Sequence, residues 1–329
     1  MAEVQTVRGP IDAAELGVTL VHEHLCARDE GVRFQFPQML VSGGDPVREV
    51  DDAGAEGLAL ESARAMVERG VRTICDPAAM FLGRDVRLMR RVSEATGLNV
   101  VAATGIYTYD HLPTALVTRD ADAIADLYVH DIDRGIQGTD ARAAFIKCAA
   151  DAPGITENVE KLHRAAARAS LRTGVPIMAH THPASGTGLR QLEIFAEEGV
   201  DLTTVQLAHT GDTTDLDYIE RVLDRGAYIG MDRFGLEMYL PFDQRIDTVV
   251  ALLERGYADR MMLSADYCAT LDWFPLELEK QMLAAGAAVD WSSTIVHDKV
   301  LPALRERGLT EAQERTLLVE NPARWLTGS

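Results

Sequence analysis

One pattern of polar and apolar positions recurs along the 329-residue chain. An amphipathic stretch ends in a short polar step and a glycine, and an apolar run follows at once. The six steps are Glu68–Gly70, Ala95–Gly97, Arg172–Gly174, Glu197–Gly199, Asp224–Gly226 and Glu254–Gly256. Glycine suits the left-handed residue that ends a helix, so each step marks a helix end before a strand. Repeated helix–strand units of this kind predict a parallel sheet covered by helices.

The same pattern predicts eight strands and eight helices. Apolar runs indicate strands at 18–22, 71–75, 98–103, 143–148, 175–179, 203–208, 227–231 and 260–265. Amphipathic stretches indicate helices at 56–69, 84–95, 119–134, 157–173, 187–198, 215–225, 245–255 and 292–306. Equal numbers of each favour a single (β/α)8 TIM barrel over residues 1–329. An open doubly wound sheet is less favoured, because no Gly-x-Gly-x-x-Gly follows the first strand.

Three further segments have no place in the repeat. Thr310–Gln313 has the sequence of a capping box and predicts one last helix. The segments 26–55 and 267–291 have the fewest regular signals, and we expect either of them to form a rim over a pocket.

Polar side chains of a particular kind lie at the ends of the predicted strands. His22 and His24 close the first strand, and their spacing of two points both side chains the same way. His180 ends the fifth strand, His209 the sixth, and Asp266 follows the eighth. A single histidine or aspartate at such a place is ordinarily a hydrogen-bonded core residue or a helix cap. Their gathering at the catalytic face of a barrel favours one metal site instead.

Lys147 stands out because it lies within an apolar strand. Its ordinary interpretation is a side chain that reaches solvent or pairs with Asp151. Burial, however, lowers a lysine pKa and leaves a nucleophilic neutral amine. Such an amine can take up carbon dioxide and become a carbamate, whose two oxygens could bridge two metals.

Four histidines, one aspartate and one carbamate suit two divalent ions, zinc first, with iron, cobalt or manganese as alternatives. A hydroxide between two such ions is a nucleophile at neutral pH. Asp266 could then receive a proton and pass it to the leaving group. Five other histidines have no assigned role: His111, His130, His163, His182 and His297, of which His182 could also face the pocket.

Charge and composition limit the partners. The net charge of −19 disfavours nucleic acid and anionic membranes, which need a basic surface. No run of about 18 apolar residues and no signal peptide are apparent, so we expect neither a membrane span nor export. The 4 cysteines have no metal-site or disulfide spacing, which favours a reducing compartment.

At these residues the chain resembles the phosphotriesterase-like lactonases of the amidohydrolase superfamily. The resemblance runs almost from end to end. It is carried by Gly17–His24, Ala103–Tyr107, Phe145–Cys148, His180–His182, His209–Asp212, Gly230–Gly235, Asp266–Cys268 and Glu320–Arg324.

The resemblance implies a role for each residue. His22, His24 and Asp266 would hold the more buried metal, and His180 and His209 the more exposed one, with carboxylated Lys147 as the bridge. Tyr107 would lie near the bridging hydroxide and stabilise the oxyanion, beside Tyr109. The implied pocket residues beyond the seventh and eighth strands are Arg233 and Trp273.

The resemblance also implies a cytoplasmic homodimer that opens lactones, notably acyl-homoserine lactones, with weaker activity on phosphotriesters. One departure concerns the segment after Tyr109–Pro113, where the family carries a longer aromatic-rich stretch and this chain passes through Thr114–Val117 into a helix. Alternative functions are a primary phosphotriesterase, a carboxylesterase or amidase, and a metal-binding barrel without catalysis.

Overall fold

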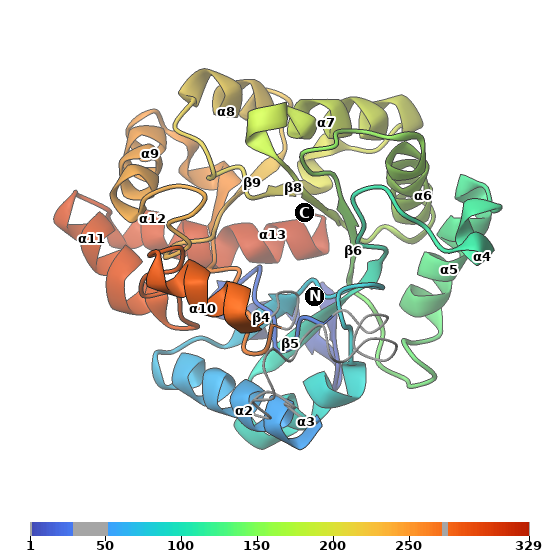
Figure 1. The fold of residues 1–329 in the computed structure, drawn as a ribbon, viewed down its shortest axis with the longest axis horizontal. Helices are drawn as coiled ribbons and strands as arrows, with labels where there is room; N and C mark the ends of the chain where they lie inside the picture. The colour runs from blue at the N-terminus through green and yellow to red at the C-terminus, as the bar shows by residue number, and fades with distance from the viewer. Residues whose placement is uncertain (1, 29–51, 272–275, 329) are drawn as a thin grey trace.

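The computed structural model describes residues 2–28, 52–271 and 276–328. Eight parallel strands form one sheet in the order β10-β9-β8-β7-β6-β5-β4-β3, which follows the chain order (Figure 1). The strands are β3 Thr19–Leu20, β4 Thr73–Asp76, β5 Asn99–Gly105, β6 Phe145–Ala149, β7 Ile177–His180, β8 Val205–Ala208, β9 Tyr228–Met231 and β10 Met261–Leu263. The predicted (β/α)8 TIM barrel is therefore confirmed.

The barrel closes between its first and last strands. The Asp266 amide donates to the carbonyl of His22 at 3.0 Å, and the His24 amide donates to the carbonyl of Tyr267 at 2.8 Å. These bonds lie just beyond the regular strands, at the end of the barrel where the candidate ligands are. Closing the sheet therefore also joins the chain segments that carry His22, His24 and Asp266.

Most of the helices surround the sheet on its outer side (Figure 1). The helices are α2 Asp52–Glu68, α3 Val86–Thr96, α4 Thr114–Val117, α5 Ala121–Asp133, α6 Glu157–Thr173, α7 Thr187–Glu198, α8 Leu216–Leu223, α9 Phe242–Glu254, α10 Leu276–Ala284, α11 Leu301–Glu306, α12 Glu311–Arg315 and α13 Asn321–Thr327. Helix α13 crosses one end of the barrel, and α10 lies at the other. The six glycines of the repeat all have φ between 76° and 91°, so the predicted left-handed residues at the helix ends are confirmed.

The structure corrects three expectations. An antiparallel hairpin, β1 Glu3–Thr6 and β2 Gly9–Asp12, precedes the barrel and was not predicted, because each strand is too short to show a period. Helix α10 lies within the segment 267–291 that was expected to be irregular. The helix predicted at 292–306 is regular only from Val296, where a π-helical turn leads into α11.

The apolar side chains form two layers. Along β5, Val101 and Ala103 belong to a cluster inside the barrel, whereas Val100 and Ala102 pack toward the helices. This alternation is the consequence of side chains pointing to opposite faces of a strand. The inner cluster fills the barrel, so the candidate site rests on a packed floor.

Helix α13 covers the end of the barrel where the strands begin. Asn321 donates from its amide nitrogen to the carbonyls of Ala258 at 2.8 Å and Met261 at 2.7 Å. The indole of Trp325 donates to the carbonyl of Thr204 at 3.2 Å. Within the described part of the chain, no helix is long and apolar enough to span a membrane.

Candidate metal centre

The six candidate ligands meet at the end of the barrel where the strands finish. His22 and His24 follow β3, Lys147 lies within β6, and His180 is the last residue of β7. His209 follows β8 and Asp266 follows β10. Every one of these side chains is buried or nearly so, and all six lie in one cluster.

Asp266 lies between the two histidines of the first strand. Its Oδ1 atom is 3.1 Å from Nε2 of His22 and 3.3 Å from Nε2 of His24. The prediction that His22 and His24 point the same way is therefore confirmed. Together the three residues offer ligand atoms within 4.8 Å of one another, which is close enough to hold one metal ion.

His180 and His209 lie beside this group. The centroids of the His180 and His209 rings are 4.4 Å apart, and the His209 ring is 4.9 Å from that of His22. Adjacent strands β7 and β8 place these rings side by side. The four imidazoles thus form a continuous group across three parts of the barrel.

Lys147 extends from strand β6 to the cluster. Its side chain is 1% exposed, and its Nζ atom is 3.5 Å from Nε2 of His22. Burial lowers the pKa of Lys147 to about 8, against the opposing effects of Asp266 and Asp232. The amine therefore lies against His22, while Asp151, its alternative partner, pairs with His180.

Asp232 contacts two of the histidines, His209 and His22, on the side of each ring away from the cluster. Its Oδ1 accepts from Nδ1 of His209 at 2.9 Å, and its Oδ2 lies 3.5 Å from Nδ1 of His22. The carboxylate is fully buried and also accepts the backbone N–H of His209 at 3.1 Å. This arrangement leaves Nε2 of both rings facing the cluster, the orientation that second-shell carboxylates give to metal-binding imidazoles.

The other two imidazoles have their own carboxylates. Nδ1 of His24 is 3.3 Å from Oδ1 of Asp76, so Nε2 faces Asp266. Nε2 of His180 is 2.6 Å from Oδ2 of Asp151, so Nδ1 faces the pocket. All four imidazoles therefore present one nitrogen to the cluster and the other to an aspartate.

Without a metal ion, the histidines of the cluster differ in pKa and therefore in which of them would be protonated. Burial lowers the pKa of His22 and of His180 to about 4, which favours the neutral form that binds metals. Burial also lowers the pKa of His24, but Asp266 and Asp76 outweigh it and raise the value to about 9. His24 is thus the imidazole whose proton a metal ion would displace.

Arg233 connects Asp266 to a second carboxylate. Its Nε donates to Oδ2 of Asp266 at 2.9 Å, and an Nη donates to Oδ2 of Asp212 at 2.8 Å. Asp212 is also paired with the buried Arg245 at 2.7 Å. Arg233 therefore lines the pocket, as predicted, but its guanidinium is already engaged by two acids.

The chain bends sharply where three of these residues leave their strands. His209, Arg233 and Asp266 have φ values of 65°, 59° and 52°, a region that non-glycine residues rarely adopt. Such strain is typical of functional sites that the surrounding structure holds in place. Here the support for Asp266 comes from Glu23.

Glu23, which follows the first strand of the barrel, binds the backbone on both sides of Asp266. Its two carboxylate oxygens accept the backbone N–H groups of Ala265 at 2.7 Å and Tyr267 at 3.1 Å. Burial raises the pKa of Glu23 against the effect of these two bonds. Glu23 thus fixes the backbone on both sides of Asp266.

Two tyrosines lie against the exposed side of the cluster. The hydroxyls of Tyr107 and Tyr109 are 2.8 Å apart, and that of Tyr107 is 3.2 Å from Nδ1 of His180. Burial raises the pKa of both tyrosines, that of Tyr109 to about 12, so both are neutral donors near neutral pH.

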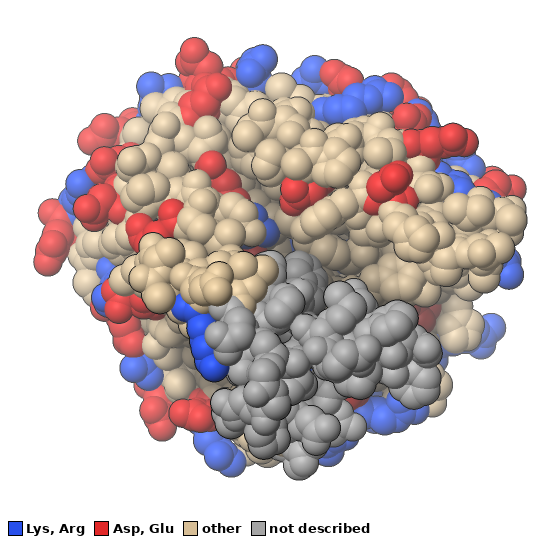
Figure 2. Space-filling view, in the orientation of Figure 1, with Lys and Arg blue, Asp and Glu red and all other residues tan. Residues whose placement is uncertain are grey.

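A cavity of about 410 Å³ opens from the cluster toward solvent. Its inner end is formed by the histidines, the tyrosines, Arg233 and Asp266. Its outer wall is largely apolar and includes Leu236, Met238, Leu271, Met282, Leu283 and Trp291. Charged side chains lie mainly around the periphery of the face shown in Figure 2. The predicted pocket residue Trp273 lies outside the described residues.

Of the five histidines without an assigned role, only His182 lines this cavity, and its Nδ1 is 2.7 Å from Oγ of Ser185. His163 is buried in α6, where its Nδ1 contacts the carbonyl of Val159 at 2.7 Å. His111, His130 and His297 lie elsewhere on the described chain.

Apart from Asp151, which was considered only as a partner of Lys147, sequence reasoning gave no role to the carboxylates that support the site, although a signal was present. Asp76 ends β4 and Asp232 follows β9, just as Asp266 follows β10. The same rule of a polar residue after an apolar strand would have selected both. Glu23 carried less signal, because it stands between two more conspicuous histidines.

The residues present suit a pair of divalent ions. Four imidazoles and a carboxylate gather at one end of the barrel, and each imidazole lies against an aspartate. Nitrogen and carboxylate donors in this proportion are those of zinc and similar ions. The buried Lys147 amine adjoins this set.

Comparisons with known proteins agree with this chemistry. The model of the phosphotriesterase family matches residues 2–326. The chain is 43% identical to an aryldialkylphosphatase of Saccharolobus solfataricus, with 96% of this chain and 97% of the relative covered. It is 27% identical to an N-acetyltaurine hydrolase of Tetraodon nigroviridis, with 99% and 98% covered.

A solved structure is similar over nearly the whole length. The phosphotriesterase from Mycobacterium tuberculosis superposes with a TM-score of 0.90 at 40% identity, and 98% of each chain is covered. Barrel, strand-end residues and sequence similarity therefore lead to one conclusion: this chain belongs to the phosphotriesterase family of metal-dependent hydrolases.

Proposed function

We propose that this protein opens lactones, such as acyl-homoserine or related γ- and δ-lactones, and hydrolyses phosphotriesters as a weaker activity. The observation that carries the proposal is the division of the cavity: polar groups gather at the metal-centre end, and the outer wall is apolar. A lactone ring with an alkyl or acyl substituent has the same division. Its ester would face the centre and its chain the apolar wall.

The proposal assigns His22, His24 and Asp266 to the more buried ion and His180 and His209 to the more exposed one. Lys147, carboxylated, would bridge them. Its support is the buried amine with a lowered pKa beside His22, since only a neutral amine reacts with carbon dioxide. Zinc suits the donors best, with iron, cobalt and manganese as alternatives.

Divalent ions held there would supply Lewis acidity and a water acidified to near neutral pH. The protein's own groups do the rest. Asp266 would accept a proton and return it to the leaving alkoxide, held in line by the 2.9 Å bond from Arg233. Tyr107, neutral and adjacent to His180, would donate to the developing oxyanion.

The ion pairs of Arg233 limit which substrates the cavity could accept. Phosphorylated lactones need a free basic group for their phosphate, but Arg233 is held by Asp212 and Asp266. Within the described lining of the cavity, no lysine and no other arginine is present. Uncharged lactones with an apolar substituent are therefore the favoured class.

The test compares specificity constants of the metal-loaded protein on acyl-homoserine lactones, simple γ- and δ-lactones and an aryl dialkyl phosphate. We expect higher kcat/KM for a lactone, with loss of turnover in His22→Asn and Lys147→Ala. His130→Asn, an exposed histidine on α5, is the matched control and should keep full activity. No lactone turnover in metal-replete protein would refute the proposal.

The second candidate is phosphotriester hydrolysis as the main activity, favoured by the aryldialkylphosphatase at 43% identity. It would use the same residues, and a higher kcat/KM for the triester would establish it. Amide hydrolysis, suggested by the name of a more distant relative, would appear as turnover of N-acylated amines in the same assay.

A further inference from the structure

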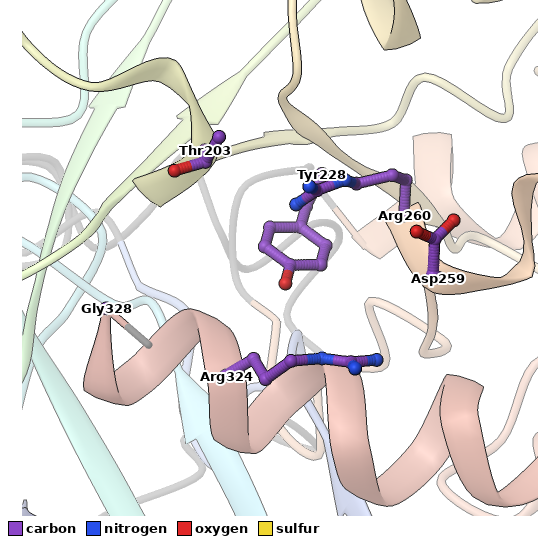
Figure 3. A pocket seen from close by; sticks show the side chains of 6 residues that line it. All are labelled: Thr203, Tyr228, Asp259, Arg260, Arg324 and Gly328. Carbon is purple, nitrogen blue, oxygen red and sulfur yellow. The ribbon is translucent and has the colours of Figure 1, made fainter.

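A second cavity lies at the opposite end of the barrel from the candidate metal centre. It has a volume of about 220 Å³, and Figure 3 shows the residues around it. They are Thr203, Tyr228, Asp259, Arg260, Arg324 and Gly328. Tyr228 begins β9 and Arg260 immediately precedes β10, so the cavity adjoins the starts of these strands, under α13.

Tyr228 is an unusual side chain for this position. It is 3% exposed and packs within the apolar cluster that fills the barrel. Its hydroxyl points into the cavity, toward α13, and has no hydrogen-bond partner within the described residues (Figure 3). A phenylalanine would fill the same space without leaving a hydroxyl unpaired, so the hydroxyl is available to a ligand.

Two guanidinium groups flank that hydroxyl. Arg260 lies over the ring of Tyr228 at 5.1 Å, and no carboxylate of the described residues forms an ion pair with it. Arg324 donates from Nη2 to Oδ1 of Asn321 at 2.6 Å, while its Nε is buried and has no partner. Asn321 in turn is anchored to the barrel floor, which fixes the position of Arg324.

The other lining groups compete little with an anion. The hydroxyl of Thr203 is already bonded to Asp201 at 2.8 Å, so Thr203 contributes its methyl group. Asp259 is the one carboxylate in the described lining, and it lies on the exposed side. Within the described lining, two positive charges and a phenol hydroxyl therefore face one exposed negative charge. Outside the lining, Asp201 interacts electrostatically with Arg260, and Glu320 with Arg324.

We propose that this cavity binds a small oxyanion, with a phosphate group as the best fit. Guanidinium groups and hydroxyls are the donors that bind phosphate oxygens, and arginine offers them in a planar fork. The volume admits inorganic phosphate or the phosphate end of a small monoester. Such a ligand would join α13 to β9 and β10, and thus stabilise the fold without entering the metal centre.

The experiment titrates inorganic phosphate, and separately glycerol phosphate, into the metal-loaded full-length protein by calorimetry. Lactone or triester hydrolysis is measured in parallel, because phosphate bound at the metals would inhibit it. We expect binding without inhibition, and a comparison of the two probes tells whether free phosphate or a monoester is preferred.

Variants connect the binding to this cavity. Arg260→Gln should weaken it about tenfold or more, and Tyr228→Phe, which keeps the ring, about fivefold. The matched control Arg225→Gln, an exposed arginine outside the described lining, should leave the affinity unchanged. Thermal melting establishes that each variant is folded, and basal hydrolysis should stay at the parent level in all three.

Two results would overturn the proposal. One is the absence of binding by either probe at millimolar concentration. The other is binding that survives both Arg260→Gln and Tyr228→Phe and that inhibits hydrolysis, which would locate the anion at the metals instead.

Discussion

Replacing Asp232 with asparagine should weaken the binding of both metal ions, because this one carboxylate supports one histidine ligand of each ion. Oδ1 accepts from Nδ1 of His209 at 2.9 Å, and Oδ2 lies 3.5 Å from Nδ1 of His22. Oδ2 also accepts the His209 backbone N–H at 3.1 Å. An asparagine keeps the shape but turns one acceptor into a donor, so an N–H group must then face another N–H.

The expected magnitude follows from the role of the carboxylate. Loss of a carboxylate behind a metal-bound imidazole typically costs about 10- to 100-fold in metal affinity, which equals about 1.4–2.7 kcal/mol. Asp232→Asn should show this loss for both ions. Asp76→Asn should show it for the ion at His24 alone, because Asp76 contacts only that imidazole, at 3.3 Å.

The assay is competition with a chelator, followed by elemental analysis of metal per chain. We expect a two-step release in which Asp76→Asn shifts one step and Asp232→Asn shifts both. Asp140→Asn, an exposed aspartate paired with Arg90, is the control and should release metal like the parent. Equal shifts for Asp76→Asn and Asp232→Asn, or none in either, would refute the reasoning.

Three further predictions concern stability. Glu23→Gln should cost about 1.5–3 kcal/mol in urea unfolding, since one of the two N–H groups flanking Asp266 loses its acceptor; no change would contradict this. Gly105→Ala should cost about 3 kcal/mol, because its φ is 128° and a Cβ would lie 1.9 Å from a carbonyl oxygen of β6. Gly57→Ala, with open space, should not destabilise. Burial lowers the pKa of His163 to about 4, so its protonation should remove about 2 kcal/mol of stability between pH 7 and 5, in addition to what the other buried histidines contribute. His163→Gln should therefore lose about 2 kcal/mol less stability than the parent over this range, and an equal loss in both proteins would contradict the prediction.

The candidate ligands could be predicted from the sequence because two local facts determine them. An apolar run fixes where a strand ends, and a histidine or aspartate at that point has a metal-binding chemistry of its own. In a barrel all strand ends meet at one face, so His180 and Asp266 come together although 86 positions separate them. The repeated helix–glycine–strand units predicted the parallel sheet in the same way, because each unit is recognisable from its local sequence.

The remaining features depend on long-range packing that leaves little local trace. The hairpin β1–β2 has four-residue strands and no clear alternation. The sequence of helix α10 has no clear apolar face, and although Gly286 follows it with a φ of 78°, alanines rather than a polar step precede that glycine. The pairing of Glu23 with the backbone around Asp266 spans more than 240 positions, and only barrel closure creates it.

The central claim is that six residues hold two metal ions with Lys147 as a carbamate bridge. A crystal structure of the metal-loaded protein, with anomalous diffraction at the metal edge, tests it most directly. We predict two ions roughly 3.5–4 Å apart and a carboxyl group on Nζ of Lys147 that contacts both. A single ion, or an unmodified Lys147 beside fully occupied metals, would contradict the account.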